Sequence, residues 1–98
     1  MLDTMTDWIM LHLGGTSFQL KTGVRNPKPI PNGVSLDLPS HRAYMKADQA
    51  QIVLVSDGTI SIEITKRNGR AFRWIDIADG VPVEEMKSRF SEMTGLEI

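Results

Sequence analysis

The strongest pattern along the chain is an alternation of β-branched and polar residues over positions 51–78, interrupted by two turn signals. Asp57-Gly58 and Asn68-Gly69 are dipeptides typical of two-residue hairpin turns, because both residues accept the positive φ that a type I′ turn requires. Directly opposed residues of paired strands share one face of a sheet, so each turn also defines a register. The pattern therefore predicts a three-stranded antiparallel meander.

This register divides the meander into two faces. The predicted core face is aliphatic and consists of Val53, Val55, Ile60, Ile62, Ile64, Ile75 and Ile77. The opposite face combines the apolar Ile52, Leu54, Phe72 and Trp74 with polar and charged residues: Ser61, Glu63, Thr65, Arg67, Arg70 and Asp76. An apolar patch with a charged rim is typical of a binding surface. The same face could instead pack on another part of the chain, as in a barrel or a three-layer arrangement.

The N-terminal residues 7–21 alternate around Gly14-Gly15, which predicts a second hairpin. One face of that hairpin would be apolar: Ile9, Leu11, Leu13, Phe18 and Leu20. Residues 22–50 are rich in proline and are predicted to be irregular. Within them, Val34–Leu38 could add a short strand, and Ser40–Ala50 could form either a strand or a turn or two of helix.

The C-terminal residues 82–95 carry the signals of an amphipathic helix. Asp79 is a candidate N-cap, Pro82 falls in the first turn, and Gly95 marks the end. The apolar residues recur at helical spacing and form one stripe: Val83, Met86, Phe90 and Met93. We expect this stripe to cover the sheet.

Together these elements predict a single α+β domain over residues 1–98, an antiparallel sheet with one C-terminal helix. If Val34–Leu38 and Arg42–Ala47 were both strands, the order would be seven strands followed by a helix. That order resembles the pleckstrin-homology-like barrels, which gives a seven-stranded barrel capped by the C-terminal helix as the alternative fold. The resemblance concerns element order alone and implies no binding residues.

Composition and charge narrow the picture further. The chain has 98 residues, no cysteine and a net charge of −1, which excludes disulfide scaffolds and thiolate metal sites. No stretch approaches the roughly 20 apolar residues of a membrane span. The first residues carry Asp3 and Asp7 rather than basic residues, and the apolar run Trp8–Leu13 is too short for the core of a signal peptide. We therefore expect a soluble, cytoplasmic protein, in host cytoplasm if it is viral. Residues 21–46 contain five basic residues against one acidic residue, whereas the part after Ile75 is acidic.

The sequence contains no pattern typical of catalysis. His12 and His41 are the only histidines, and neither lies in a metal-binding or nucleophile motif. No glycine-rich phosphate loop is present. We therefore expect no enzyme, no cofactor and no metal.

The expected function is protein–protein interaction. The chain would be an adaptor, inhibitor or assembly subunit, of a kind common among phage and mobile-element accessory proteins. It would bind another protein, or a second copy as a homodimer, through a sheet face or an edge strand. The candidate binding residues are Ile52, Leu54, Glu63, Arg67, Arg70, Phe72 and Trp74. The alternative is a single-stranded nucleic-acid binder, in which Phe72 and Trp74 would stack bases beside the neighbouring arginines.

Overall fold

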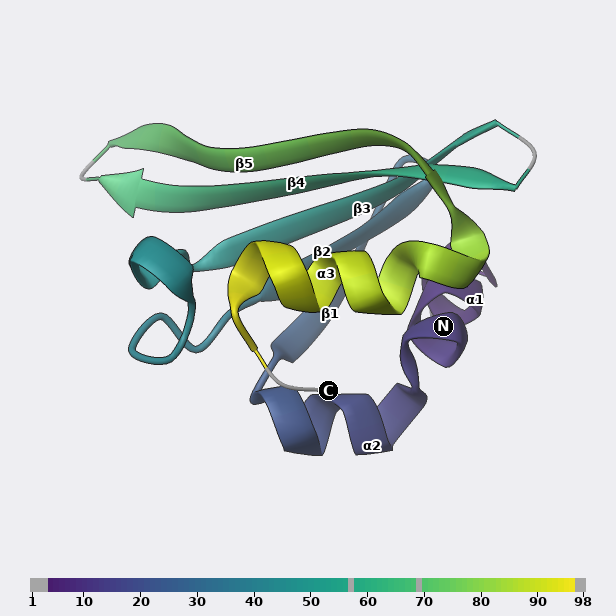
Figure 1. The fold of residues 1–98 in the computed structure, drawn as a ribbon, viewed down its shortest axis with the longest axis horizontal. Helices are drawn as coiled ribbons and strands as arrows, with labels where there is room; N and C mark the ends of the chain where they lie inside the picture. Colours follow the sequence, from purple (N-terminus) through teal and green to yellow (C-terminus); the bar gives the residue numbers. More distant parts are fainter. Residues whose placement is uncertain (1–3, 57, 69, 97–98) are drawn as a thin grey trace.

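The computed structural model describes residues 4–56, 58–68 and 70–96, which form an α+β fold with a five-stranded antiparallel sheet (Figure 1). The strands lie in chain order: β1 Arg25–Ile30, β2 Gly33–Asp37, β3 Gln49–Ser56, β4 Thr59–Asn68 and β5 Ala71–Pro82. The helices are α1 Thr4–Leu13, α2 Gly15–Thr22 and α3 Met86–Thr94, with 3-10 turns at Tyr44–Lys46 and Val83–Glu85. The predicted fold class, an antiparallel sheet with a C-terminal helix, is confirmed.

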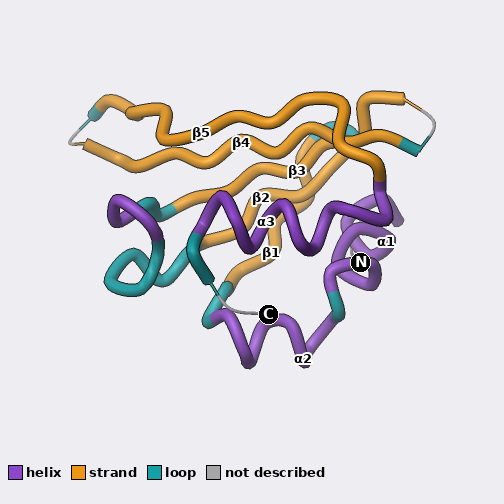
Figure 2. The backbone as a smooth tube through the Cα atoms, viewed as in Figure 1, coloured by secondary structure: helices purple, strands orange, loops and turns teal. Residues whose placement is uncertain are grey.

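The three helices lie on one side of the sheet (Figure 2). Helix α1 packs on β1 and β2, and α3 packs on β4 and β5. None of the described helices combines the length and the apolar character needed to cross a bilayer. The sheet therefore has one covered face, the inner face, and one face without helices, the outer face.

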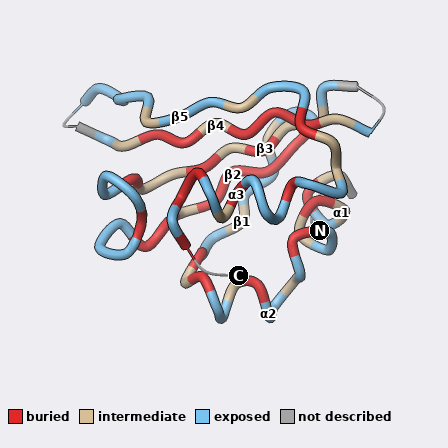
Figure 3. Tube along the Cα trace, viewed as in Figure 1, coloured by how far each residue is buried: buried red, intermediate tan, exposed pale blue. Residues whose placement is uncertain are grey.

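The core lies between the inner face and the helices, where fully buried residues concentrate (Figure 3). The sheet contributes Val34, Leu36, Ala50, Ile52, Ile60, Ile62 and Ile64. The helices contribute Ile9, Leu13, Phe18, Met86, Phe90 and Met93, and the rings of Phe18 and Phe90 meet edge to face with centroids 5.3 Å apart. Burying each large aliphatic side chain contributes about 1.5–3 kcal/mol. The predicted stripe of α3 is thus part of the core.

The predicted register between β3 and β4 is wrong by one residue. Ser56 pairs with Thr59, but a bulge follows, so that Leu54 pairs with Ile60 and Ile52 with Ile62. One extra residue moves every following side chain to the other face of the sheet. Ile52 is consequently fully buried, Leu54 packs partly buried against the core, and Val55 is 63% exposed.

The β4–β5 register differs from the prediction by two residues, which preserves the faces near the turn. Arg67 pairs with Phe72 and Thr65 with Trp74, in place of the expected pairs of Thr65 with Phe72 and Glu63 with Trp74. A bulge beyond Trp74 then reverses the alternation. As a result, Ile77 pairs with Glu63 and is 48% exposed, rather than lying in the core.

The predicted N-terminal hairpin is wrong, since residues 4–22 form two helices instead. Ile9 and Leu13 are one helical turn apart and are both buried, while Leu11 and Leu20 are 74% and 79% exposed. The glycine pair joins the helices, with φ of 121° at Gly14 and 59° at Gly15. Short apolar runs satisfy strand and helix periods alike, and here packing against β1 and β2 favours the helix.

Of the remaining predictions, some are confirmed and others are wrong. Residues 22–50 contain two ordered strands, and the short strand expected at Val34–Leu38 corresponds to β2. Residues 44–46 form a 3-10 turn and the sheet is open, so the seven-stranded barrel is not the fold. Helix α3 ends as expected at Gly95, where φ is 73°. Asp79 is not its N-cap, because Asp79 lies within β5.

Candidate functional site

The outer face carries a row of exposed apolar side chains on β5. Phe72, Trp74 and Ile77 are 56%, 57% and 48% exposed, respectively. Val53 of β3 adds a partly exposed aliphatic side chain. We call Phe72, Trp74 and Ile77 the apolar row, from which β4 separates Val53. Large aromatic side chains that stay this exposed are typical of interaction surfaces.

Cross-strand pairing explains the arrangement. Thr65 has Gln49 on one side and Trp74 on the other, whereas Glu63 has Gln51 and Ile77. These residues share the outer face because directly paired residues point to the same side of a sheet. A hollow of about 120 Å³ lies between the aromatic rings and the glutamines, lined by Gln49, Gln51, Thr65, Phe72 and Trp74.

The middle of the outer face consists of short hydroxyl side chains beneath longer polar ones. Ser35, Ser61 and Thr65 are less than a tenth exposed. Ser35 Oγ accepts a hydrogen bond from Gln49 Nε2 at 2.9 Å, and Ser61 Oγ donates to Asp79 Oδ1 at 2.9 Å. The apolar row therefore borders a polar surface whose buried hydroxyls have partners.

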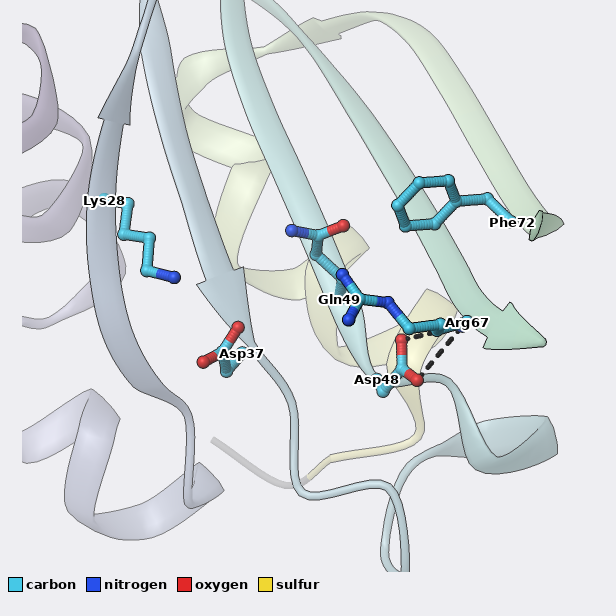
Figure 4. Close-up of a pocket in the computed structure, with 6 residues that line it drawn as sticks. All are labelled: Lys28, Asp37, Asp48, Gln49, Arg67 and Phe72. Atoms are coloured by element: carbon cyan, nitrogen blue, oxygen red, sulfur yellow. Dashed lines mark hydrogen bonds between the residues drawn. The ribbon is translucent and has the colours of Figure 1, made fainter. Parts of the chain in front are cut away.

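A charged cleft of about 360 Å³ lies at the end of the outer face where β3 begins (Figure 4). Its lining residues come from all five strands and from the residue just before β3: Lys28, Asp37, Asp48, Gln49, Arg67 and Phe72. Both carboxylate oxygens of Asp48 accept hydrogen bonds from the Arg67 backbone N–H, at 3.1 and 3.0 Å. The Arg67 guanidinium carbon lies 5.7 Å from the centroid of the Phe72 ring.

The charges on the outer face are of both signs. Four carboxylates, those of Asp37, Asp48, Glu63 and Asp79, share it with Lys28, Arg67 and Arg25, the last of which pairs directly with Asp37. Asp37 Oδ2 accepts a hydrogen bond from Asn26 Nδ2 at 2.8 Å. An aromatic row with charges of both signs around it suits a protein surface better than a phosphate backbone.

Neither edge of the sheet offers a regular ladder for another strand. Along β5 two bulges break the spacing, and the Ile77 N–H donates to the Asp76 carboxylate at 2.9 Å. Along β1, Pro27 and Pro29 lack N–H groups, and Lys28 stands between them. Bulges, prolines and edge charges are the usual means by which proteins discourage strand addition.

The structure brings together four of the seven candidate binding residues. Glu63, Arg67, Phe72 and Trp74 lie on the outer face. Arg70 is exposed in the turn between β4 and β5. Ile52 and Leu54 were placed on this face wrongly, since both side chains belong to the inner side.

Sequence reasoning missed several residues of the outer face, among them Lys28, Asp48, Gln49, Gln51 and Ile77. A signal for the glutamines was present: the run Gln49, Ala50, Gln51, Ile52 alternates polar and apolar, which directs Ile52 inward. Ile77 had no comparable signal, because its position depends on a bulge in β5.

The two histidines lie apart from the outer face. His12 Nδ1 is within hydrogen-bond distance of the Trp8 carbonyl oxygen, at 2.8 Å, and the two rings are 4.2 Å apart. His41 lines a separate hollow beside α2. Within the described part of the chain, no group of three or more His, Cys, Asp or Glu side chains could hold a metal ion.

The chain matches no protein-family model, no curated protein and no solved structure.

Proposed function

We propose that this protein is a small binding domain that recognises another protein through the outer face of its sheet. The observation that carries the proposal is the apolar row, in which two aromatic side chains stay more than half exposed on a face without helices. The row is bordered by Gln49, Gln51 and Glu63, which provide hydrogen-bonding groups around an apolar centre. Protein interfaces have this anatomy, with aromatic side chains enriched at the centre and a polar rim.

Single-stranded nucleic acid is the competing partner, because aromatics on an open sheet beside arginines can stack bases. Arg67 over Phe72 is the one observation that favours it. The four carboxylates that lie among the cations of the same face oppose it, since phosphate binding requires a positive groove. The proposal therefore commits to a protein partner, and nucleic acid becomes an outcome of the test.

The test is affinity capture from nuclease-treated lysate with the wild-type chain and with Phe72→Ala/Trp74→Ala. We expect a protein captured by the wild type to be lost with the double variant, because aromatic anchors dominate interface energies. Leu11→Ala/Tyr44→Ala is the matched control: it removes two side chains that are more exposed than the aromatics but lie on α1 and on the 3-10 turn Tyr44–Lys46. This control should capture the same protein.

Capture is then repeated with purified components over a range of salt concentrations. An apolar protein interface should weaken little as salt rises, whereas a phosphate-driven complex weakens steeply. Loss of all bound material on nuclease treatment would contradict the proposal in favour of nucleic acid. Equal capture by the double variant and the wild type would contradict it altogether.

A further inference from the structure

A second hollow lies between α2, the start of β1 and residues 39–42. Its volume is about 570 Å³, and it shares no lining residue with the cleft or the hollow on the outer face. The residues that line it are Thr16, Gln19, Leu20, Gly23, Val24, Arg25, Pro39, His41 and Arg42. We call it the basic groove.

The base of the basic groove is apolar. Val24 and Pro39 are buried, while Leu20 at the rim is 79% exposed. Fully wetting an aliphatic side chain is unfavourable, so contact between Leu20 and an apolar group of a ligand would stabilise a complex. The surface can therefore accept an aliphatic side chain.

Arg42 is held in position above the end of α2. Its Nη2 donates a hydrogen bond to the Lys21 carbonyl oxygen at 3.2 Å. Gly23, with φ of 81°, ends the helix beneath it, and a Cβ atom there would lie only 3.2 Å from Arg42 Nη1. Glycine thus provides both the left-handed backbone and the room for the guanidinium. Because the hydrogen bond to Lys21 uses only one N–H group of Arg42, the others can reach a ligand.

The charge of the basic groove is one-sided. Arg25, Arg42 and His41 line it, and none of the described aspartates or glutamates does. Among the residues that the structure describes, the Arg25 side chain forms no hydrogen bond or ion pair, although Arg25 pairs with Asp37 across β1 and β2. Arginines that are not already in an ion pair bind carboxylates through paired, charge-assisted hydrogen bonds. The outer face differs, since four carboxylates lie among its cations.

We propose that the basic groove binds an acidic segment of a protein partner, in which a glutamate or aspartate stands next to an aliphatic residue. The carboxylate is received by Arg25 and Arg42, and the aliphatic side chain lies against Leu20 and Val24. Arginine clusters that read acidic motifs are a recurrent mode of peptide recognition. This site does not depend on the function proposed for the outer face, so either proposal can fail alone.

The experiment uses the ¹⁵N-labelled full chain and two blocked peptides, one alternating leucine with glutamate and the other alternating leucine with glutamine. We expect the glutamate peptide to shift the amide resonances of residues 19–25 and 41–43, with affinity that falls as salt rises. The glutamine peptide should bind at least about tenfold more weakly, because it lacks the charge that the arginines require. Equal binding of both peptides would overturn the proposal.

Three variants locate the site. Arg25→Gln alone leaves the Arg42 hydrogen bond intact, and Arg25→Gln/Arg42→Gln removes both charges. Each variant should weaken the binding of the glutamate peptide, and the double variant should weaken it more. Arg89→Gln removes an exposed arginine from α3 and should bind as the wild type does. Equal losses in Arg89→Gln and Arg25→Gln would show a non-specific charge effect and contradict the site.

A third ligand, octanoate, tests whether the basic groove binds a protein segment or a free organic acid. Octanoate carries a carboxylate and an aliphatic chain without a peptide backbone. We expect it to bind more weakly than the glutamate peptide, because it offers a single carboxylate. Octanoate binding as tightly as the peptide would overturn the assignment to a protein segment. Phe72→Ala/Trp74→Ala should leave peptide binding unchanged, which separates this site from the outer face.

Discussion

The two faces of the sheet are built from the same strands and share residue types, yet one is buried and the other is exposed. On the inner face, Ile52, Ile62 and Ile64 are fully buried against the helices. On the outer face, Ile77 and Trp74 remain about half exposed among glutamines and carboxylates. The difference does not follow from hydrophobicity, since isoleucine occurs on both faces. It follows from which face the helices cover, and the bulges of β3 and β5 decide which isoleucine points where.

The largest expected difference in the free energy of unfolding is between alanine variants of isoleucines on opposite faces of the sheet. Ile52→Ala and Ile62→Ala should each lower the free energy of unfolding by about 2–5 kcal/mol, because each would leave a cavity in the core. Ile77→Ala should change it by less than about 1 kcal/mol, as expected for an exposed side chain. Urea denaturation of the three variants provides the measurement. A loss of more than 2 kcal/mol in Ile77→Ala would mean that the faces are assigned wrongly.

An intermediate effect on the free energy of unfolding is expected at the charged cleft, where Asp48 accepts hydrogen bonds from the Arg67 N–H. Asp48→Ala removes the acceptor of the Arg67 N–H, and losing one such hydrogen bond costs about 1 kcal/mol. Hydrogen exchange at the Arg67 amide should accelerate at the same time, while exchange at the Ile62 amide should accelerate only by as much as the loss of global stability requires. If the Arg67 amide exchanged at its wild-type rate, the hydrogen bond would have no role in solution.

The smallest effect on stability is expected for the aromatics of the apolar row. Phe72→Ala and Trp74→Ala should each lower the free energy of unfolding by less than about 1 kcal/mol, which corresponds to lost cross-strand pairing. Trp74 should also be open to solvent, so acrylamide should quench Trp8→Phe, in which Trp74 remains, more strongly than Trp74→Phe. The reverse order of quenching would place Trp74 inside the fold.

The sequence predicted some features of this fold reliably and others not at all. The stripe of α3 was readable because Met86, Phe90 and Met93 keep one period over two turns. Phe72 and Trp74 were placed on the correct face because a two-residue shift in register preserves the alternation. Ile52 and Ile77 were misplaced because each bulge adds one residue, and the local pattern contains no signal for it.

The N-terminal helices and the basic groove were not predicted from the sequence, for a different reason. Ile9, Leu13 and Phe18 fit a strand or a helix, and only their packing on the sheet selects the helix. The groove joins Arg25 to Arg42, which are 17 positions apart and lie on β1 and an irregular segment. The excess of positive charge over residues 21–46 was visible, but not its convergence on one apolar hollow.

The most direct test of the central claim is site-specific photo-cross-linking at Ile77. p-Benzoylphenylalanine replaces Ile77 on the outer face in one protein and Leu11 on α1 in another, both of which are exposed positions. The account predicts a discrete, nuclease-resistant protein adduct from position 77 that is absent from position 11, and its loss when Phe72 and Trp74 are also replaced by alanine. A protein adduct from position 11 alone would contradict the claim that the outer face is the binding surface.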